Sequence, residues 1–246
     1  MIKYQIIIEY VGTNFLGWQY QRNGNSIQKT IQVVLSKLLK EKIKLHGAGR
    51  TDKGVHAIGQ SAHFECKKNI LNIQKFIYSL NFFLNKKEIS IKKLEKKNIS
   101  FHARHSAKKR TYVYKIRNNI SPSVLNKNRE WHIKKKLSIE LLKKGSKKLV
   151  GTHNFSTFQA ANCNAKSPIK TMIEVKVISK NGVLTIKFVS KSFLKSQVRS
   201  MVGCLKYLSE KKWSLKKFAN IVKSKNRQNC APLAPPHGLY LERVTY

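Results

Sequence analysis

The sequence predicts an α+β protein built from two similar halves. An order of strand-like and helix-like segments, βαββαβ, occurs twice along the 246 residues. The 41% hydrophobic content is enough to form real cores, and no low-complexity linker interrupts the chain. We therefore expect two halves that share one continuous structure, residues 1–105 and 106–246.

The first two elements are a strand at residues 1–10 and a helix that begins after Ser26. In the strand, apolar side chains occur at every second residue, which places them on one face. They are Ile2, Tyr4, Ile6, Ile8 and Tyr10. Ser26 is a favourable N-cap, and the apolar residues that follow it form one helical stripe. These are Ile27, Ile31, Val34, Leu35, Leu38 and Leu39.

The first half continues with two strands, a helix and a closing strand. We expect the strands at about 43–48, 59–65 and 89–94. The helix, at about 72–84, has apolar residues at helical spacing. They are Ile73, Phe76, Ile77, Leu80 and Leu84.

The second half repeats this order. Its expected strands are 110–118, 171–179, 183–190 and 239–244, and its expected helices are 138–149 and 193–209. Asn181-Gly182 is typical of a tight hairpin turn. An extra helix at 214–223 and a segment with Pro232, Pro235 and Pro236 precede the last strand. The repeated order predicts two ferredoxin-like halves with antiparallel sheets that flank a central cleft.

The charge of the chain predicts a polyanionic partner. Fifty Lys and Arg residues against 11 Asp and Glu give a formal net charge of +39, so nucleic acid is the first expectation. An AT-rich coding bias also produces a chain rich in Lys, Asn and Ile. Since the basic residues are spread along the whole chain, charge alone does not locate a binding face.

Membrane, metal and disulfide roles are not indicated. No apolar run approaches the ~20 residues of a membrane-spanning helix, and no signal peptide is evident, so we expect a cytoplasmic protein. The glutamates are scattered and the histidines lack ligand partners at suitable spacing, which argues against a metal site. The cysteines lie far apart without a CxxC pair, which predicts reduced thiols. They are Cys66, Cys163, Cys204 and Cys230.

The most informative segment is the loop between the second and third strands. It reads Gly47-Ala48-Gly49-Arg50-Thr51-Asp52-Lys53-Gly54-Val55-His56-Ala57. Three glycines in this short loop indicate special backbone conformations or the close approach of a ligand. It is not a P-loop, because Val55 and His56 stand where that motif needs Lys and Ser or Thr.

Asp52 is the only aspartate in the chain and follows Arg50 in this loop. A carboxylate beside an arginine is anionic at neutral pH and can act as a nucleophile or a base. This placement favours a catalytic role. The alternative is structural, an Asx-turn or a salt bridge within the loop.

The loop resembles the signature loop of the TruA family of tRNA pseudouridine synthases. Further segments resemble blocks of this family, in the same order along the chain. They are Tyr10–Gln19, Phe101–Arg104, Arg110–Tyr114, Val198–Gly203, Ala231-Pro232 and Gly238–Leu241. The resemblance implies the pseudouridine synthase fold and a homodimer. It also implies isomerisation of uridine to pseudouridine at positions 38, 39 and 40 of the tRNA anticodon stem and loop, without cofactor or metal.

The resemblance implies roles for four residues. Asp52 matches the catalytic aspartate, which either attacks C1′ of the ribose or removes a proton at C2′. Tyr112 packs on the flipped uracil and assists proton transfer at C5, Arg199 pairs with the aspartate, and Arg50 helps to extrude the base. Without the family, Tyr112 reads as a core aromatic residue of a strand and Arg199 as a solvated helix arginine.

The chain also departs from the family pattern. Lys53 occupies a position that is usually small, Asn154 one that is typically Asp, Ser192 one that is commonly Asn, and Gln197 one that is usually Met. These departures concern packing around the site and leave the expected reaction class unchanged.

Two alternatives without catalysis compete with this interpretation. A basic protein made of tandem RNA-recognition domains would need an RNP1 pattern, but Arg110–Lys115 lacks its Gly-Phe core. A basic ribosome-associated protein would account for the charge and not for a single aspartate in a glycine-rich loop.

Overall fold

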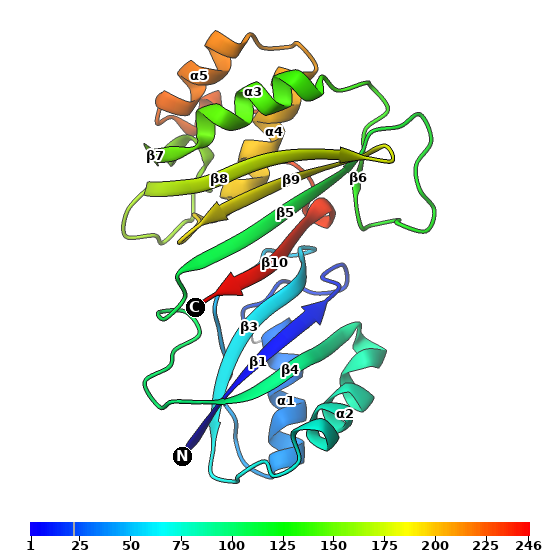
Figure 1. The fold of residues 1–246 in the computed structure, drawn as a ribbon, viewed down its shortest axis with the longest axis vertical. Helices are drawn as coiled ribbons and strands as arrows, with labels where there is room; N and C mark the ends of the chain where they lie inside the picture. Colours follow the sequence, from blue (N-terminus) through cyan, green and yellow to red (C-terminus); the bar gives the residue numbers. More distant parts are fainter. Residues whose placement is uncertain (22) are drawn as a thin grey trace. The chain divides into compact units, whose positions relative to one another are not determined.

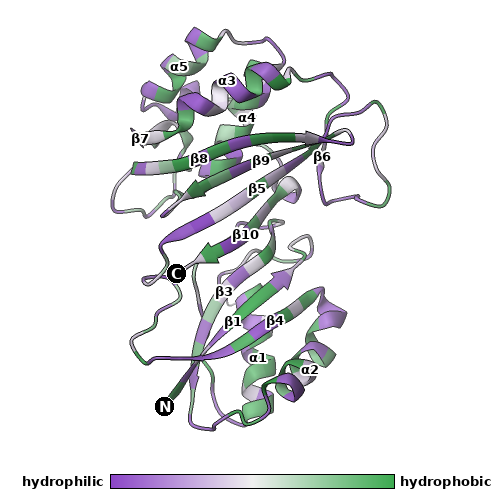
Figure 2. Cartoon of the chain, in the orientation of Figure 1, coloured by the Kyte–Doolittle hydropathy of each residue, from purple (hydrophilic) through white to green (hydrophobic). Residues whose placement is uncertain are grey.

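The computed structural model describes residues 1–21 and 23–246 and has the expected α+β fold (Figure 1). Hydrophobic residues gather in strands such as β1 (Ile2–Tyr10) and on the first helix, α1 (Ile27–Leu39) (Figure 2). In the described part of the chain, no helix is both long and apolar enough to cross a membrane.

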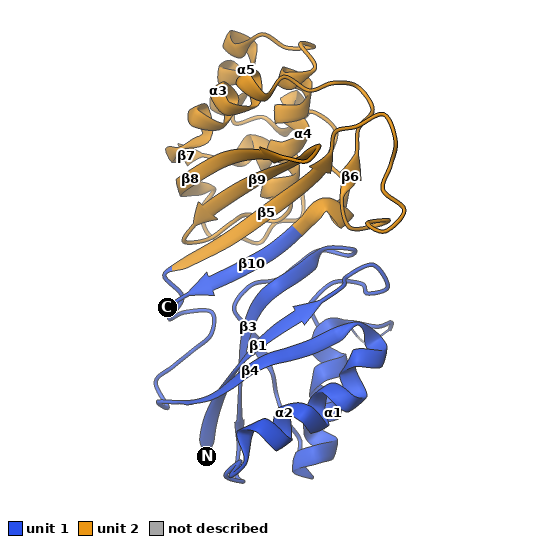
Figure 3. Cartoon of the chain, turned by 45° about the vertical axis from the view of Figure 1, so that its right-hand side comes forward, with its two compact units in different colours: residues 1–108, 240–246 blue, residues 109–239 orange. Residues whose placement is uncertain are grey.

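The chain forms two compact units (Figure 3). Unit 1 comprises Met1–Lys108 and Tyr240–Tyr246, and unit 2 comprises Lys109–Leu239. The first boundary lies three residues beyond the one expected from the sequence. The last strand differs from expectation, because most of it lies in unit 1. There, Tyr240 and Leu241 pair in parallel with His56 and Ala57.

Unit 1 contains two helices against a sheet in the order β4-β1-β3, with β2 and β10 both paired to β3. Strand β1 is antiparallel to both neighbours, with Ile6 opposite Ala62 and Leu94. Beside β1 and α1, the elements are β2 (His46–Gly47), β3 (His56–Cys66), α2 (Ile73–Leu84), β4 (Ile89–Lys97) and β10 (Leu239–Thr245).

The core of unit 1 follows from the period of its first two elements. Ser26 caps α1 by accepting the Lys29 N–H, as expected of an N-cap serine. The apolar face of β1 and the stripe of α1 are buried. The buried residues are Tyr4, Ile6, Ile8 and Tyr10 on β1, and Ile27, Ile31, Val34, Leu35 and Leu39 on α1.

The expected strand at 43–48 is wrong except for its end, β2. In residues 43–45, directly before β2, main-chain groups form hydrogen bonds with side chains of α1. This segment therefore packs along the helix and does not join the sheet. The contacts are Ile43 N–H to Ser36 Oγ at 2.9 Å, Leu45 N–H to Gln32 Oε1 at 3.1 Å, and Gln28 Nε2 to the Leu45 carbonyl at 2.7 Å.

Unit 2 has a sheet in the order β5-β9-β8-β7, antiparallel throughout, with the short β6 parallel to β5. Helix α3 packs against α4, α5 and β8. The elements are β5 (Lys109–Arg117), β6 (Trp131–His132), α3 (Ile139–Leu149), β7 (Gly151–Asn154), β8 (Ile169–Lys180), β9 (Val183–Ser190), α4 (Gln197–Ser209) and α5 (Leu215–Lys223).

Local backbone geometry explains two details of unit 2. Asn181 and Gly182 both have positive φ, 50° and 72°, as a tight hairpin turn requires. Helix α4 begins at Gln197 and not at the expected residue 193. Ser196 has a left-handed backbone, with φ 59°, which interrupts helical geometry at that point.

Candidate active site

Asp52 is the first residue of a tight turn at the end of the loop between β2 and β3. Its carbonyl accepts the Val55 N–H at 3.1 Å, and Gly54, the third residue, has φ 77°. A positive φ at this position strongly favours glycine. The turn thus fixes the backbone of Asp52, whose side chain is half-buried.

The beginning of the loop is tied to β3. The Ala48 N–H donates to the Ser61 carbonyl at 2.7 Å. The side chain of Gln60 donates through Nε2 to the Gly49 carbonyl, also at 2.7 Å. Both ends of the loop are therefore held, and the exposed Arg50 lies between them.

A second segment, residues 11–18, supports the loop through main-chain contact. A Cβ atom at Gly12 would lie 2.0 Å from the Val55 carbonyl oxygen, and one at Gly17 would lie 2.5 Å from the Thr51 oxygen. Gly17 also has φ 101°. The Trp18 N–H donates to the same Thr51 oxygen at 3.1 Å. Only glycine allows backbones this close, so the two glycines help to set the position of the Asp52 turn.

Side chains complete the support. The hydroxyls of Tyr10 and Thr51 form a buried hydrogen bond of 2.8 Å. His56 Nδ1 accepts the Gly12 N–H at 3.0 Å, and the His56 ring lies 4.8 Å from the ring of Tyr240. These contacts join β1, β3 and β10 to the loop directly before and after Asp52.

Tyr112 lies on β5 in unit 2. It is opposite Phe188 on β9, and its ring meets Phe193 edge-to-face with centroids 5.0 Å apart. Only 7% of the residue is exposed. Tyr112 is thus a buried residue of unit 2, with its ring oriented by a neighbouring aromatic side chain.

Arg199 is the third residue of α4, also in unit 2. Its Nε donates to the Ala234 carbonyl at 2.8 Å, and its own carbonyl accepts the Ala234 N–H at 3.3 Å. In the same proline-rich segment, Pro235 accepts the Tyr114 hydroxyl at 2.7 Å. Burial and then the Arg199 charge lower the pKa of His237. The segment after residue 230 therefore holds the guanidinium group in place.

Two of the four departures from the family pattern, Gln197 and Asn154, make capping contacts in unit 2. Gln197 Oε1 accepts the Leu194 N–H at 2.8 Å at the start of α4. Asn154 Oδ1 accepts the Ser156 N–H at 3.0 Å, a role that an aspartate also performs. Ser192 is hydrogen-bonded to Ser190, and Lys53 is exposed.

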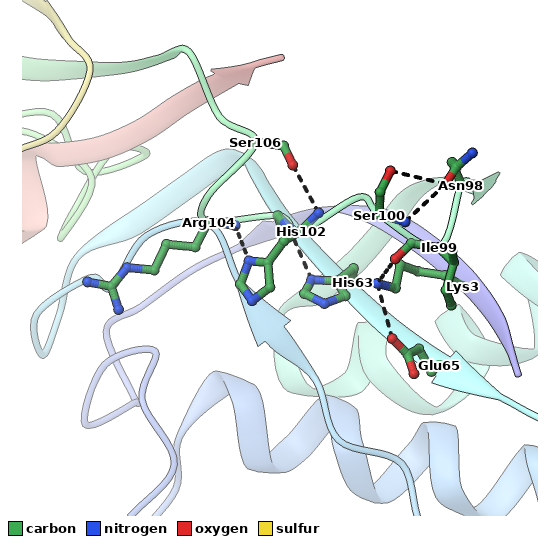
Figure 4. A network of polar contacts seen from close by, with 10 residues as sticks. Lys3, His63, Glu65, Asn98, Ile99, Ser100, His102, Arg104 and Ser106 are labelled. Atoms are coloured by element: carbon green, nitrogen blue, oxygen red, sulfur yellow. Dashed lines mark hydrogen bonds and ion pairs between the residues drawn. The ribbon is translucent and has the colours of Figure 1, made fainter.

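His46, His63 and His102 form a histidine cluster in unit 1, and Figure 4 shows His63 beside His102. His63 Nδ1 accepts the Ala103 N–H at 3.2 Å, and His102 Nδ1 accepts the Arg104 N–H at 3.1 Å. The ring of His46, the residue before Gly47, stacks on His63 at 5.0 Å. Burial, followed by the charges of His102, His46 and Lys3, lowers the pKa of His63 to about 4. His63 is therefore neutral at pH 7.

Within residues 1–21 and 23–246, no group of three or more His, Cys, Asp or Glu side chains is placed to hold an ion. In the cluster, the ring nitrogens that accept main-chain N–H groups serve a structural purpose.

Comparison with known proteins decides the family. The family model described as tRNA pseudouridine synthase matches residues 6–106 and 146–246. The chain belongs to the tRNA pseudouridine synthase family. Members of this family isomerise uridine to pseudouridine in tRNA. The match includes the Asp52 loop, the segment before it, and the segment from Arg199 to the C-terminal strand.

Curated proteins of this family align with the chain over their whole length. The chain is 62% identical to tRNA pseudouridine synthase A of Pelagibacter ubique (strain HTCC1062) over 246 residues. It is 43% identical to the protein of the same name from Neorickettsia sennetsu (strain ATCC VR-367 / Miyayama), and 42% identical to that of Ehrlichia chaffeensis (strain ATCC CRL-10679 / Arkansas). Each alignment covers 100% of both chains.

The structure thus places Asp52 and Arg50 on one supported loop of unit 1, and Tyr112 and Arg199 on β5 and α4 of unit 2. Sequence reasoning missed the residues that support the loop, above all Gly12, Gly17 and His56. A signal was present, since both glycines lie in the Tyr10–Gln19 block that resembles the family. The main-chain atoms that Gly12 and Gly17 approach can be identified only in the folded structure.

Proposed function

We propose that the protein converts uridine to pseudouridine at positions 38, 39 and 40 of the tRNA anticodon stem and loop, with Asp52 as the catalytic group. The observation that carries this proposal is the placement of the only aspartate in a backbone-fixed turn, in a chain of this family. The net charge of +39 supports binding of a long polyanion.

In this proposal, Asp52 either attacks C1′ of the ribose or removes a proton at C2′. Either route releases the uracil, which rotates and rejoins the sugar through C5. Tyr112 packs on the flipped base and assists proton transfer at C5, Arg199 pairs with the carboxylate, and Arg50 helps to extrude the base. Because substrate and product contain the same atoms, the reaction needs no co-substrate.

The decisive experiment compares two carboxylate-to-amide variants on unmodified tRNA. Asp52→Asn keeps the shape of the side chain and removes the charge, and Glu140→Gln removes one charge from an exposed position of α3. We expect no pseudouridine above background with Asp52→Asn, retained tRNA affinity, and normal activity with Glu140→Gln. Turnover of Asp52→Asn near the wild-type rate would overturn the assignment.

The same assay tests the alternative of a non-catalytic RNA-binding protein, which predicts no pseudouridine even with the wild-type chain. Affinity adds a second readout. Contact with about six phosphates implies a ~10³-fold loss of affinity between ~50 and ~200 mM salt. A flat salt dependence would contradict the electrostatic part of the proposal. We place the enzyme in the cytoplasm, where tRNA is its substrate.

We also propose that the protein acts as a homodimer through the outer face of α2. This helix is rich in apolar residues, yet only Leu80 and Leu84 are buried. Tyr78 and Phe82, one turn apart on the same face, are 77% and 62% exposed. An exposed aromatic pair of this kind supports contact with a second chain.

Light scattering tests the dimer. We expect Tyr78→Lys combined with Phe82→Glu to give a monomer at micromolar concentration, where the wild-type chain is a dimer. Leu125→Glu, at a 96% exposed residue of unit 2, is the matched control and should leave the dimer intact. A monomeric wild-type chain with full activity on whole tRNA would overturn the proposal.

A further inference from the structure

Two cysteines that are 26 residues apart in the sequence meet in unit 2. Cys204 lies on α4, and Cys230 follows a short 3₁₀ turn at Arg227–Asn229. Their sulfur atoms are 3.4 Å apart. Cys204 is completely buried and Cys230 is half-buried, so only Cys230 is open to a small reagent.

The surroundings of the two thiols differ in a way that separates their reactivity. The hydrogen bond between the two sulfur atoms lowers the pKa of Cys230, and the nearby Arg227 charge adds to this effect. The same hydrogen bond and burial raise the pKa of Cys204. Arg227 is itself positioned by a 3.0 Å hydrogen bond to Ser200 Oγ. Cys230 is therefore the thiol that ionises first, and the thiolate is the reactive form.

We propose that Cys204 and Cys230 form a thiol oxidation site that closes to a disulfide when the protein meets a peroxide. The Cys230 thiolate attacks one oxygen of hydrogen peroxide, breaks the O–O bond and becomes a sulfenic acid. The hydroxide that leaves takes up the proton that the Cys230 thiol lost on ionisation, which gives water. The Cys204 sulfur then attacks the Cys230 sulfur and expels a second water. The two thiols lose two electrons and two protons, and the peroxide is reduced to two water molecules.

The disulfide would tether residues 230–234, the segment that positions Arg199 through hydrogen bonds of Ala234. A Cβ atom at Gly203 would lie 2.1 Å from the Pro232 carbonyl oxygen, so the chain after Cys230 already lies tightly on α4. It ends at Ala234, which makes two hydrogen bonds to Arg199. A disulfide bond of ~2.05 Å draws the two sulfurs more than 1 Å closer than they are in the dithiol. Oxidation therefore shifts the support of Arg199.

The bond itself is tested on the whole protein, without reference to activity. We expect brief treatment with hydrogen peroxide to lower the mass of the protein by two hydrogens and to join the peptides that contain Cys204 and Cys230. Dithiothreitol should restore the mass. Cys163 and Cys66 should remain open to alkylation under denaturing conditions and serve as internal controls. Equal alkylation of all four cysteines after peroxide would overturn the proposal.

Two variants test the order of the steps. In Cys204→Ala, the Cys230 sulfenic acid has no resolving partner and should be trapped by dimedone. In Cys230→Ser, Cys204 should give no dimedone adduct, because it is buried. An adduct at Cys204 in that variant, or none at Cys230 in the first, would overturn the assignment of the reactive thiol. The circular dichroism spectrum of each variant confirms that it folds.

The effect on activity rests on the proposed function, whereas the disulfide does not. We expect the oxidised enzyme to lose pseudouridine formation about tenfold, with recovery on reduction, and the Cys230→Ser variant to be insensitive to peroxide. A disulfide that forms without changing activity would overturn the coupling to Arg199. A wild-type protein that forms the disulfide and makes no pseudouridine under any condition would instead contradict the proposed function.

Discussion

The loop of Asp52 and the setting of Arg199 are held in different ways. Asp52 lies in a turn that two glycines of another segment approach within contact distance of the main chain. On the Arg199 side, Gly203 makes a similar close approach to the Pro232 carbonyl, but the guanidinium group itself is reached through a long side chain that hydrogen-bonds to Ala234. Main-chain contacts tolerate almost no displacement, whereas a long side chain can adjust through its rotamers. We therefore expect the Asp52 loop to be much less tolerant of substitution.

Among substitutions that leave the proposed catalytic residues unchanged, the largest expected effect is that of Gly12→Ala. The new methyl group would overlap the Val55 carbonyl and push the Asp52 turn away, and a displacement of this size costs about 10²-fold in rate. The matched variant is Gly203→Ala, whose methyl group would overlap the Pro232 carbonyl on the Arg199 side. It should cost about tenfold. Single-turnover rates measure both, and equal losses would abolish the distinction between the two regions.

Arg199→Lys should have a smaller effect than the loss of Asp52. Lysine keeps the charge and lacks the planar Nε donor that binds the Ala234 carbonyl. We expect a fall in kcat on the order of 10- to 100-fold with little change in tRNA affinity. The comparison with Arg199→Gln, which removes the charge, separates charge from geometry. Full activity of the lysine variant would show that the Nε contact is unimportant.

Acid should destabilise unit 1 through His63. Its pKa in the folded protein is about 4, below the ordinary value of 6.5, so unfolding takes up a proton between these values. Stability is then complete above about pH 6.5 and falls as the pH drops towards 4. We expect the Tm to fall by roughly 5–10 °C over this window.

The matched variant for this effect is His63→Asn, whose Oδ1 can accept the Ala103 N–H that His63 Nδ1 now accepts. It should reduce the loss of Tm in acid. Some dependence will remain, because His102 also has a pKa lowered by burial and by neighbouring histidines. A His63→Asn curve that matches the wild-type curve at every pH would exclude His63 as the cause.

The smallest expected effect is that of the Tyr10–Thr51 hydrogen bond. Thr51→Val and Tyr10→Phe each remove one hydroxyl of a buried pair, which costs about 1–2 kcal/mol in the free energy of unfolding. The double variant should cost little more than either single variant, because the bond is lost once. Denaturant titrations measure all three, and strictly additive losses would show that the hydroxyls do not interact.

Much of the fold could be predicted because local periodicity decides which side of an element is buried. The alternation of Ile6 and Ile8 and the stripe of α1 gave buried faces, and Ser26 capped its helix as expected. The start of α4 could not be predicted, because the residue types around Ser196 do not indicate a left-handed backbone. Local patterns do not report a backbone conformation that tertiary contacts impose.

For the candidate site, the sequence identifies the loop and the family. The glycine-rich loop with the single aspartate, and the family to which it belongs, could be identified from the sequence. The roles of Asp52, Tyr112, Arg199 and Arg50 stay predictions. The contacts that hold the loop could not be predicted. Gly12 is far from Val55 in sequence, and the presence of a glycine does not indicate which backbone it will contact.

The sequence by itself thus determined the type and order of the main elements, the polyanionic character of the partner, and the loop that carries Asp52. Those properties depend on the spacing and chemistry of neighbouring residues. The tertiary structure alone decided that most of the last strand belongs to unit 1, that α1 draws residues 43–45 away from the sheet, and that Cys204 meets Cys230. Each of these depends on contact between distant parts of the chain, which packing and backbone hydrogen bonding select only when the whole fold forms.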